Sequence, residues 1–431
     1  MTDTNKQLSR RNPWWWIPTL YFVEALPYAA VMTVSVIMYK NLGLSNTDIA
    51  LYTGWLYLPW VIKPFWSPAV DIVRSKRWWV LAMQWGMAAG IALLTLALPA
   101  PAFVRLTLGA FWLVAFMSAT HDIAADGFYM LGLSEHDQVM YVGIRSTFYR
   151  IGSLAGQGVL VMLAGTIEDH GGSAQTAWMI TFGVLSAFFC LTALYHTVVL
   201  PRPKADADRR AGSFGALTRE FMGTFVSFFK KPQIGTAIAF MLLYRLPEAQ
   251  LVKLISPFLL DSPEAGGLGL SVSQVGVVYG TIGVSGLVIG GILGGLAAAR
   301  GGLKKWLQPM VWMMSLTCVT FLYLSYADAP SLLTVNVCVF IEQFGYGFGF
   351  TAYMLYLIYF SEGPLQTSHY AICTGFMALS MMLPGMAAGW IQEQLGYQNF
   401  FIWVMVCCTA TVAVSRFIKV DADFGKKNSS K

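Results

Sequence analysis

Charged residues lie inside stretches of this sequence that are otherwise apolar. The stretch from Trp14 to Lys40 has Glu24 and Pro27 near its middle. If such a stretch crosses a lipid bilayer, a carboxylate at that depth costs at least about 2.5 kcal/mol, which indicates a functional or paired group. Ten charged residues occupy comparable positions, five acidic and five basic: Glu24, Asp122, Asp126, Glu248, Glu342, Lys63, Arg145, Arg150, Arg245 and Lys253.

Three kinds of role are predicted for these residues and their polar neighbours. A proton can be carried by a carboxylate that is charged when solvated and neutral when enclosed, and the candidates are Glu24, Glu248 and Asp122. Cations and nearby polar or aromatic groups can bind a polar solute, and the candidates are Tyr21, Tyr28, Lys63, Arg150, Gln157, Arg245, Glu342 and Tyr346. Structural or gating ion pairs are expected for Asp71, Asp126 and Arg145. A purely structural pairing is the alternative for every one of them.

The composition places these residues in a membrane. Of 431 residues, 56% are apolar and only 12% are charged, whereas soluble proteins have about 25% charged residues. Apolar stretches long enough to span a bilayer recur along the whole chain. The first follows Lys6, Arg10 and Arg11 and is too long for a secretory signal, so we expect it to stay as a spanning helix.

Patterns for catalysis, metal binding or cofactor binding are missing from the sequence. The six cysteines all fall inside apolar stretches, where we expect them to pack as small side chains without a disulfide or metal framework. There is no phosphate-binding loop, zinc pattern or nucleophile paired with a base. The sequence therefore predicts no enzyme, cofactor, metal site or nucleic-acid partner. The expected partners are the lipid bilayer, a small-molecule substrate and protons, and we expect a monomer.

Twelve membrane spans account for the apolar stretches, so we predict an all-α integral membrane protein. The longest polar interruption separates six spans from six, and its second part, around Leu217 to Phe229, has the pattern of an amphipathic surface helix. We expect an N-terminal six-helix bundle (1–200), a cytoplasmic central loop (201–232) and a C-terminal six-helix bundle (233–431). The predicted spans are 14–40, 47–73, 78–99, 102–131, 138–167, 175–200, 233–260, 272–299, 306–327, 331–360, 367–392 and 397–419.

Basic residues are distributed unevenly between the two sides of these spans. Of the 28 Lys and Arg residues, 21 fall in the two termini, the central loop and the short loops on the same side. Only Lys40 and Arg105 fall in loops on the opposite side. Because cytoplasmic loops are enriched in Lys and Arg, both termini are predicted to be cytoplasmic.

The two halves of the sequence repeat at one offset. A shift of 224 residues brings FYML at 128–131 onto AYML at 352–355, and AGTI at 164–167 onto AGWI at 388–391. Two six-helix halves related by an axis along the membrane normal are the architecture of the major facilitator superfamily. In that architecture the substrate site lies near mid-membrane, between the halves.

Depth along the helices predicts which charges meet in the N-terminal half. Spans four and five form a hairpin, and residues equally distant from its turn lie at equal depth, which pairs Asp122 with Arg150 and Asp126 with Arg145. The two acids share one face of span four. The two arginines are about 140° apart around span five, so one of them is expected to turn elsewhere. Counting from the cytoplasmic ends of the spans predicts one charged layer: Glu24, Lys63, Asp122 and Arg150.

The C-terminal half contains a related set of charges. The same offset of 224 residues brings Glu24 onto Glu248, which shares a face of span seven with Arg245. In span ten, Glu342 begins a glycine-rich stripe that continues through Gly345, Tyr346, Gly349 and Tyr353. We expect Glu24 and Glu248 to face one central cavity from opposite halves.

Two stretches resemble a known family of permeases. They are FWSPAVDIVRSKRWW at 65–79, which ends span two, and residues 118–158, which cover spans four and five. The shared features are W-S-P-x-x-D at 66–71, D-I-x-x-D at 122–126 and Y-R-x-G at 149–152. They are similar to the AmpG-type muropeptide permeases and, more distantly, to the acetyl-CoA transporter family. The resemblance implies symport of 1,6-anhydro-muropeptides with protons, by alternating access across the bacterial inner membrane, for peptidoglycan recycling.

The sequence departs from that family at two places. Small residues are usual where this chain has Glu24, and basic residues are usual in the loop that reads SEHDQ here. Two alternatives therefore stay open. One is a transporter of another amphipathic or anionic small molecule, such as a drug, a siderophore or a CoA-like compound. The other is a non-transporting membrane receptor, which the balanced buried charges disfavour.

Overall fold

The computed structural model describes residues 12–72, 74–133, 135–203, 206, 214–362, 366–421 and 424. Within these residues every regular element is helical, which confirms the predicted all-α class. Nine continuous helical segments in this part of the chain are long and apolar enough to cross a membrane, and the longest contains two spans joined at Gly396. Spans two and seven are each broken into two shorter helices, which completes the twelve predicted spans.

The first half contains six spans, of which spans one, two and five are irregular. Spans one and five each pass through a short π-helical segment, and span two is interrupted between Trp55 and Leu58. The elements are η1 (Pro13–Trp15), α1 (Ile17–Ala29), η2 (Ala30–Val34), α2 (Ser35–Asn41), α3 (Asn46–Trp55), α4 (Leu58–Ile72), α5 (Lys76–Ala97), α6 (Phe103–Gly132), α7 (Glu135–Leu154), η3 (Ala155–Val159), α8 (Leu160–Asp169) and α9 (Ala174–Val199).

The second half follows α11 (Phe214–Phe229), which confirms that the second part of the central loop is helical. Phe225 of α11 packs against Phe65 of α4, with ring centroids 6.0 Å apart, and Phe228 packs against Phe360 of the second half. This half comprises α12 (Ile234–Leu243), α13 (Leu246–Leu260), η4 (Pro263–Ala265), α14 (Val272–Val275), η5 (Gly276–Gly283), α15 (Val284–Gly301), α16 (Leu303–Thr317), α17 (Val319–Tyr326), α18 (Leu332–Ser361) and α19 (Gln366–Arg416).

Serine residues mark where several of these helices begin. The hydroxyl of each accepts a hydrogen bond from a backbone N–H in the first turn of the helix, which satisfies a donor that has no partner within the helix. At Ser271, Gln274 also accepts from the serine backbone N–H, which forms a capping box. The serines are Ser45, Ser75, Ser173, Ser271 and Ser331.

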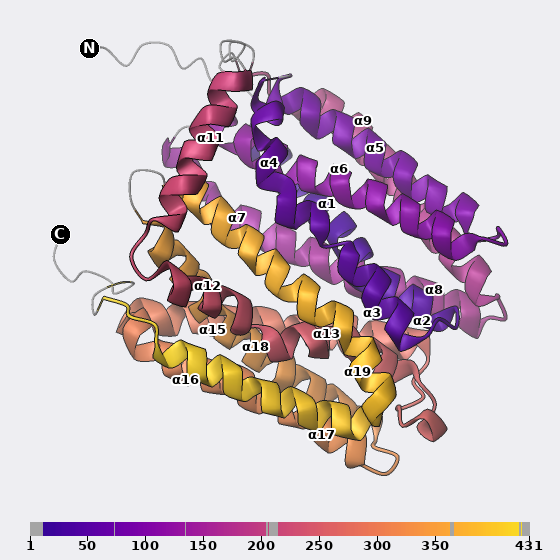
Figure 1. Ribbon diagram of the computed structural model, residues 1–431. Helices are drawn as coiled ribbons and strands as arrows, with labels where there is room; N and C mark the ends of the chain where they lie inside the picture. The colour runs from indigo at the N-terminus through magenta and orange to yellow at the C-terminus, as the bar shows by residue number, and fades with distance from the viewer. Residues whose placement is uncertain are drawn as a thin grey trace, which may run out of the picture.

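The two halves lie side by side along the length of the bundle. Figure 1 shows the first-half helices, indigo to magenta, on one side and the second-half helices, crimson through orange to yellow, on the other. Helix α11 lies at one end of this bundle (Figure 1), which we call the linker end. At this end Asp206 accepts hydrogen bonds from the backbone N–H groups of Lys76 and Arg77, at 2.6 and 3.0 Å. The opposite end, which holds the turns at 42–45 and 261–271, is the far end.

Two glycines let the halves approach closely toward the far end. A Cβ atom on Gly389 would lie 1.9 Å from the backbone oxygen of Asn46, and one on Gly165 would lie 2.2 Å from the backbone nitrogen of Ser273. Real Cβ atoms do not approach backbone atoms so closely, so both positions require glycine. These are the glycines of the repeated AGTI and AGWI sequences. The internal repeat therefore marks two symmetry-related contacts between the halves.

Span seven, predicted as one helix over 233–260, breaks between α12 and α13 at Tyr244 and Arg245. Arg245 is not helical, with φ −99° and ψ 10°, and Pro247 follows in the first turn of α13. The carbonyl oxygen of Tyr244 accepts a hydrogen bond from the Thr411 hydroxyl at 3.0 Å. A broken spanning helix is tolerated where neighbouring helices satisfy the freed backbone groups in this way.

Candidate functional site

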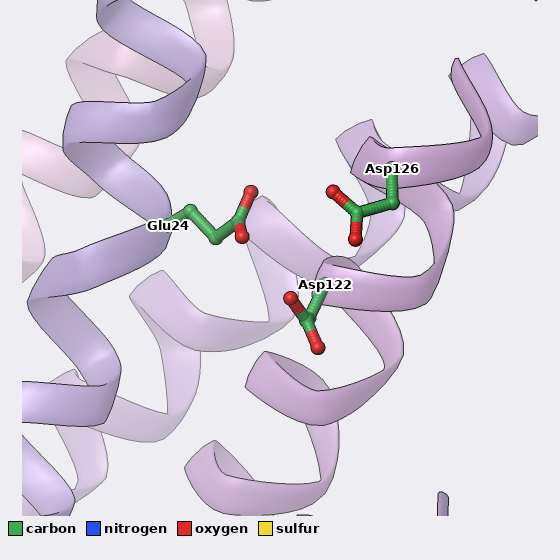
Figure 2. Close-up of side chains that lie close together, drawn as sticks. All are labelled: Glu24, Asp122 and Asp126. Carbon is green, nitrogen blue, oxygen red and sulfur yellow. The ribbon is translucent and has the colours of Figure 1, made fainter. Parts of the chain in front are cut away.

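Three carboxyl groups meet between α1 and α6. Glu24 projects from α1 toward Asp122 and Asp126, which lie one turn apart on α6 (Figure 2). One carboxylate oxygen from each residue lies within 4.8 Å of the others. The spacing of four residues puts both aspartates on one helix face, as the sequence predicts.

Two cations accompany these carboxylates. Lys63 of α4 forms an ion pair with Asp122, and Arg145 of α7 forms one with Asp126. The second pair confirms the prediction from depth. The Arg145 guanidinium also lies over the ring of Tyr21, 4.4 Å from its centroid, where it gains cation–π attraction. We call Glu24, Lys63, Asp122, Asp126 and Arg145 the N-half cluster.

The N-half cluster is partly accessible and carries an excess of one carboxylate. The paired side chains of Lys63 and Asp122 are 23% and 24% exposed, and those of Arg145 and Asp126 are 30% and 42% exposed. Glu24 is only 6% exposed, and within the part of the chain that the structure describes its Oε2 atom has no hydrogen-bond partner. Since three carboxylates meet two cations, one negative charge is left uncompensated when all five groups are ionised.

The predicted pair of Asp122 with Arg150 is wrong, because Lys63 is the ion-pair partner of Asp122. Arg150 is partly buried and forms no ion pair with a carboxylate of the described residues. Equal depth fixes only the height of a residue in the membrane. The turn of about 140° from Arg145 to Arg150 carries the deeper arginine off the shared face. Of the predicted charged layer, Glu24, Lys63 and Asp122 therefore come together, and Arg150 does not join their ion pairs.

Three other predicted site residues are less directly connected to the cluster. Tyr28 of α1 lies edge-on to Trp60 of α4, with ring centroids 5.2 Å apart. Gln157 lies in η3 at the contact between the halves, where its backbone oxygen would be 2.2 Å from a Cβ atom on Gly280. The side chain of Asp71 lies outside the described residues, so its predicted ion-pair role stays a prediction.

The C-terminal half holds a more enclosed pair at the break in span seven. Arg245 Nη2 lies 3.1 Å from Glu248 Oε2 and also donates to the hydroxyl of Tyr346 at 2.7 Å. The ring of Phe350 lies against the guanidinium, 4.8 Å from its centroid. The side chains of Arg245 and Glu248 are only 8% and 2% exposed. We call Arg245, Glu248 and Tyr346 the C-half cluster.

The predicted stripe on α18 serves largely to pack helices. Gly349 accepts a hydrogen bond from Tyr244 through its carbonyl oxygen at 2.8 Å, and Tyr353 donates to the backbone of Met241 at 2.8 Å. Glu342, at the start of the stripe, is 1% exposed and accepts from Gln343 at 2.8 Å. It forms no ion pair with a cation among the described residues.

Polar contacts join the two halves at the far end. Lys40 forms an ion pair with Asp261 at 2.6 Å, and Tyr397 donates to the same carboxylate at 2.6 Å. Nearby, the backbone N–H and the hydroxyl of Thr47 donate to Glu393, at 2.9 and 2.5 Å. None of these contacts was predicted, because they join loops and helix ends that are distant in the sequence.

Lys253 was assigned no role from the sequence, yet it lies where the halves meet. Its ammonium donates to Thr53 of α3 at 2.8 Å and lies 5.1 Å from the ring centroid of Tyr57. A signal was available in the sequence. The positions three and four residues away on either side are Ala249, Gln250, Ser256 and Pro257, so α13 offers no carboxylate partner.

The N-half carboxylates resemble a metal-binding triad, since carboxylate oxygens are preferred ligands of hard cations. Lys63 and Arg145 already bind two of them, however. A divalent ion would have to displace both side chains. The single negative charge that remains matches a monovalent cation such as a proton.

Comparison with known families and proteins agrees with this architecture. Residues 19–361 match the family model described as Major Facilitator Superfamily. The chain is 25% identical over 403 residues to the anhydromuropeptide permease of Escherichia coli, covering 89% of this chain and 75% of that protein. It is 23% identical over 415 residues to the putative transporter AmpG 4 of Rickettsia conorii, covering 93% of this chain and 94% of that protein.

Solved structures show the same fold. A crystal structure of the nucleoside transporter NupG matches with a TM-score of 0.71 at 15% identity, covering 94% of this chain and 99% of that one. A crystal structure of a D-xylose–proton symporter matches with a TM-score of 0.68 at 13% identity, covering 95% and 98%. The family match and these relatives indicate a multi-pass membrane transporter and not an enzyme. The chain belongs to the major facilitator superfamily and is similar to its AmpG-type permeases.

Proposed function

We propose that this chain imports anhydromuropeptides, or closely similar glycan-containing solutes, together with protons across the bacterial inner membrane. The observation that carries the proposal is the N-half cluster, in which one carboxylate remains after two ion pairs have formed. An importer driven by protons needs such a group, near the solute and reachable by water. The substrate class is supported by the relatives named anhydromuropeptide permease and AmpG transporter.

Glu24 carries the proton in this account. Its Oε2 atom is buried and accepts no hydrogen bond from the described residues, and the Asp122 and Asp126 carboxylates lie beside it. Like charges at this distance disfavour one another, and a proton on Glu24 removes the repulsion. A solute carboxylate that binds Lys63 would leave Asp122 without its cation. Solute and proton then act on one electrostatic cluster, which couples their binding.

We interpret the structure as one of the two states that such a cycle needs. The far-end contacts seal the bundle, whereas the N-half cluster is partly exposed. With both termini in the cytoplasm, as the basic residues predict, the sealed end faces the periplasm and the protein faces inward. Entry of solute then requires that Lys40 separate from Asp261 and Thr47 from Glu393.

The orientation can be tested by labelling single cysteines. Ser173 lies at the far end and Gly215 lies in α11 at the linker end, and both residues are exposed. In intact spheroplasts an impermeant maleimide is expected to label Ser173→Cys but not Gly215→Cys. Labelling of Gly215→Cys before the membrane is permeabilised would contradict the orientation.

The function is tested by uptake of a labelled anhydromuropeptide into inverted and right-side-out membrane vesicles that contain the protein. We expect accumulation in right-side-out vesicles when a proton gradient is imposed, and its loss when an uncoupler is added. Vesicles without the protein are the control. Uptake that does not depend on the imposed proton gradient would contradict proton coupling. Uptake no higher than in the control vesicles would contradict the substrate class.

A further inference from the structure

Lys253 is a buried cation that has no carboxylate partner among the described residues. It lies in the middle of α13 and is 2% exposed. No acidic group of the described residues lies within ion-pair distance of its ammonium. The other buried basic residue of this helix region, Arg245, has Glu248 as its partner. The charge of Arg245 is therefore balanced by a neighbouring carboxylate, whereas the charge of Lys253 is not balanced by a carboxylate of the described residues.

The groups around Lys253 are neutral and come from both halves of the protein. Its Nζ donates a hydrogen bond to Thr53 Oγ1 at 2.8 Å. The Thr53 hydroxyl in turn donates to the backbone oxygen of Ile49 at 2.7 Å. The Tyr57 ring lies 5.1 Å from the ammonium. On the other side, a Cβ atom on Gly385 would lie 3.3 Å from Lys253 Cγ. One hydroxyl and one ring face do not satisfy the three donors of an ammonium group.

A lone buried ammonium is costly, so its retention needs a compensating anion at some stage of the cycle. Charged residues inside membrane spans are rare, usually face the bundle interior, and often mark substrate or ion pathways. Tyr57, whose ring lies over Lys253, is in the neighbourhood of Tyr28 and Tyr346. Tyr28 and Tyr346 are both predicted from the sequence to bind the solute. Lys253 thus adjoins the region between the halves where a solute is expected.

We propose that Lys253 binds a carboxylate of the solute when the far end is open, and that Thr53 takes the place of that carboxylate when the far end is closed. The inference rests on the proposed function, because it assumes that an anionic solute is carried. Opening the far end separates α3 from α13, which breaks the contact with Thr53 and exposes the ammonium. A solute entering from that end then meets a cation that no protein carboxylate neutralises.

The test compares two solutes that differ only in charge. One is the disaccharide of N-acetylglucosamine and 1,6-anhydro-N-acetylmuramic acid, which has a free lactyl carboxylate, and the other is its primary amide. Uptake of each is measured in vesicles with an imposed proton gradient. A hydrogen-bonded charge pair corresponds to about ten- to hundredfold in affinity, so the unchanged protein is expected to have a KM higher by that factor for the amide.

Lys253→Met is expected to raise the KM for the acid about ten- to hundredfold and to leave the KM for the amide within about twofold. Thr53→Val removes the closed-state partner but keeps the ammonium, so it should preserve the preference for the acid. Lys40→Met is the matched control, because it removes another lysine contact between the halves at the far end. It too should preserve that preference. The temperature at which Lys253→Met unfolds in detergent should be no lower than that of the unchanged protein, because the substitution with methionine removes an uncompensated buried charge.

The outcomes separate the inference from the proposed function. No uptake of either solute by the unchanged protein would overturn the proposed function, and the role of Lys253 with it. Uptake of both solutes with an unchanged acid preference in Lys253→Met would overturn the role of Lys253 alone. A strong loss of thermal stability in Lys253→Met, with an equal loss of uptake in Thr53→Val, would show that the contact between Lys253 and Thr53 only stabilises the structure and does not bind solute. Loss of gradient-driven accumulation with the acid preference intact would assign Lys253 to the proton instead.

Discussion

The two halves of the protein hold their buried charges in different ways. In the N-half cluster both ion pairs join separate helices and are partly exposed, and the third carboxylate, Glu24, forms no ion pair with a cation of the described residues. In the C-half cluster Arg245, at the break before α13, pairs with Glu248 in the first turn of α13, and both side chains are almost completely buried. Aromatic side chains cover that guanidinium.

This difference separates two residues that the internal repeat makes equivalent. Glu24 and Glu248 occupy the same position in the two halves, but Glu248 shares one of its oxygens with Arg245 whereas Glu24 adds a carboxylate to two others. A pair that is enclosed and neutral suits a structural role. An accessible cluster with one excess charge suits exchange of a proton. The repeat therefore preserves the position of the acid and not its role.

The largest expected effect is on stability, from breaking the C-half pair. Glu248→Gln leaves the Arg245 guanidinium buried without its counter-charge, which should lower the free energy of unfolding by about 3–5 kcal/mol. Unfolding in detergent, monitored by circular dichroism or thermal aggregation, measures the loss. Replacing both residues together, with Arg245→Met and Glu248→Leu, should recover most of it. A Glu248→Gln variant as stable as the unchanged protein would remove the distinction between the two halves.

A smaller effect is expected where the two halves are alike. Gly389→Ala and Gly165→Ala would each place a Cβ atom against the backbone of the opposite half, at 1.9 and 2.2 Å. Such overpacking costs about 1–3 kcal/mol and should favour a state in which the far end is open. Gly183→Ala on α9 is the matched control, because its Cβ atom would meet no atom within 4 Å. The measurements are the stability toward unfolding and the rate at which a maleimide labels a cysteine placed at the far end. If all three alanine variants gave the same values, the symmetry-related contacts would not stabilise the closed state.

The sequence predicts most of the fold and about half of the contacts at the site. Span positions follow from apolar length, and the pair of Asp126 with Arg145 follows from depth on either side of one hairpin. Depth does not give the direction in which a side chain points, and so the same rule fails for Arg150. Pro247 indicates from the sequence that a bend is allowed in span seven, but the hydrogen bond from Thr411 that satisfies the freed carbonyl oxygen of Tyr244 could not be predicted, because the two residues are far apart in the sequence.

The smallest stability effect is expected for the ion pairs of the N-half cluster. Asp122→Asn should lower the free energy of unfolding by only about 1 kcal/mol or less, because the pair with Lys63 is partly hydrated. Exchanging the charges, with Lys63→Asp and Asp122→Lys, should restore part of any loss of uptake in a double-mutant cycle. Strictly additive effects of the two single changes would show that these residues are not coupled. If Asp122→Asn lowered the free energy of unfolding as much as Glu248→Gln does, the pair of Lys63 with Asp122 would have a structural role.

The most direct measurement concerns Glu24, on which the proposed coupling depends. Glu24→Gln keeps the size of the side chain and removes the excess carboxylate of the N-half cluster. We expect the variant to lose accumulation of labelled anhydromuropeptide driven by a proton gradient, while it still exchanges labelled for unlabelled solute across the vesicle membrane at nearly the normal rate. Accumulation against the solute gradient by Glu24→Gln would contradict the assignment of the coupled proton to this residue.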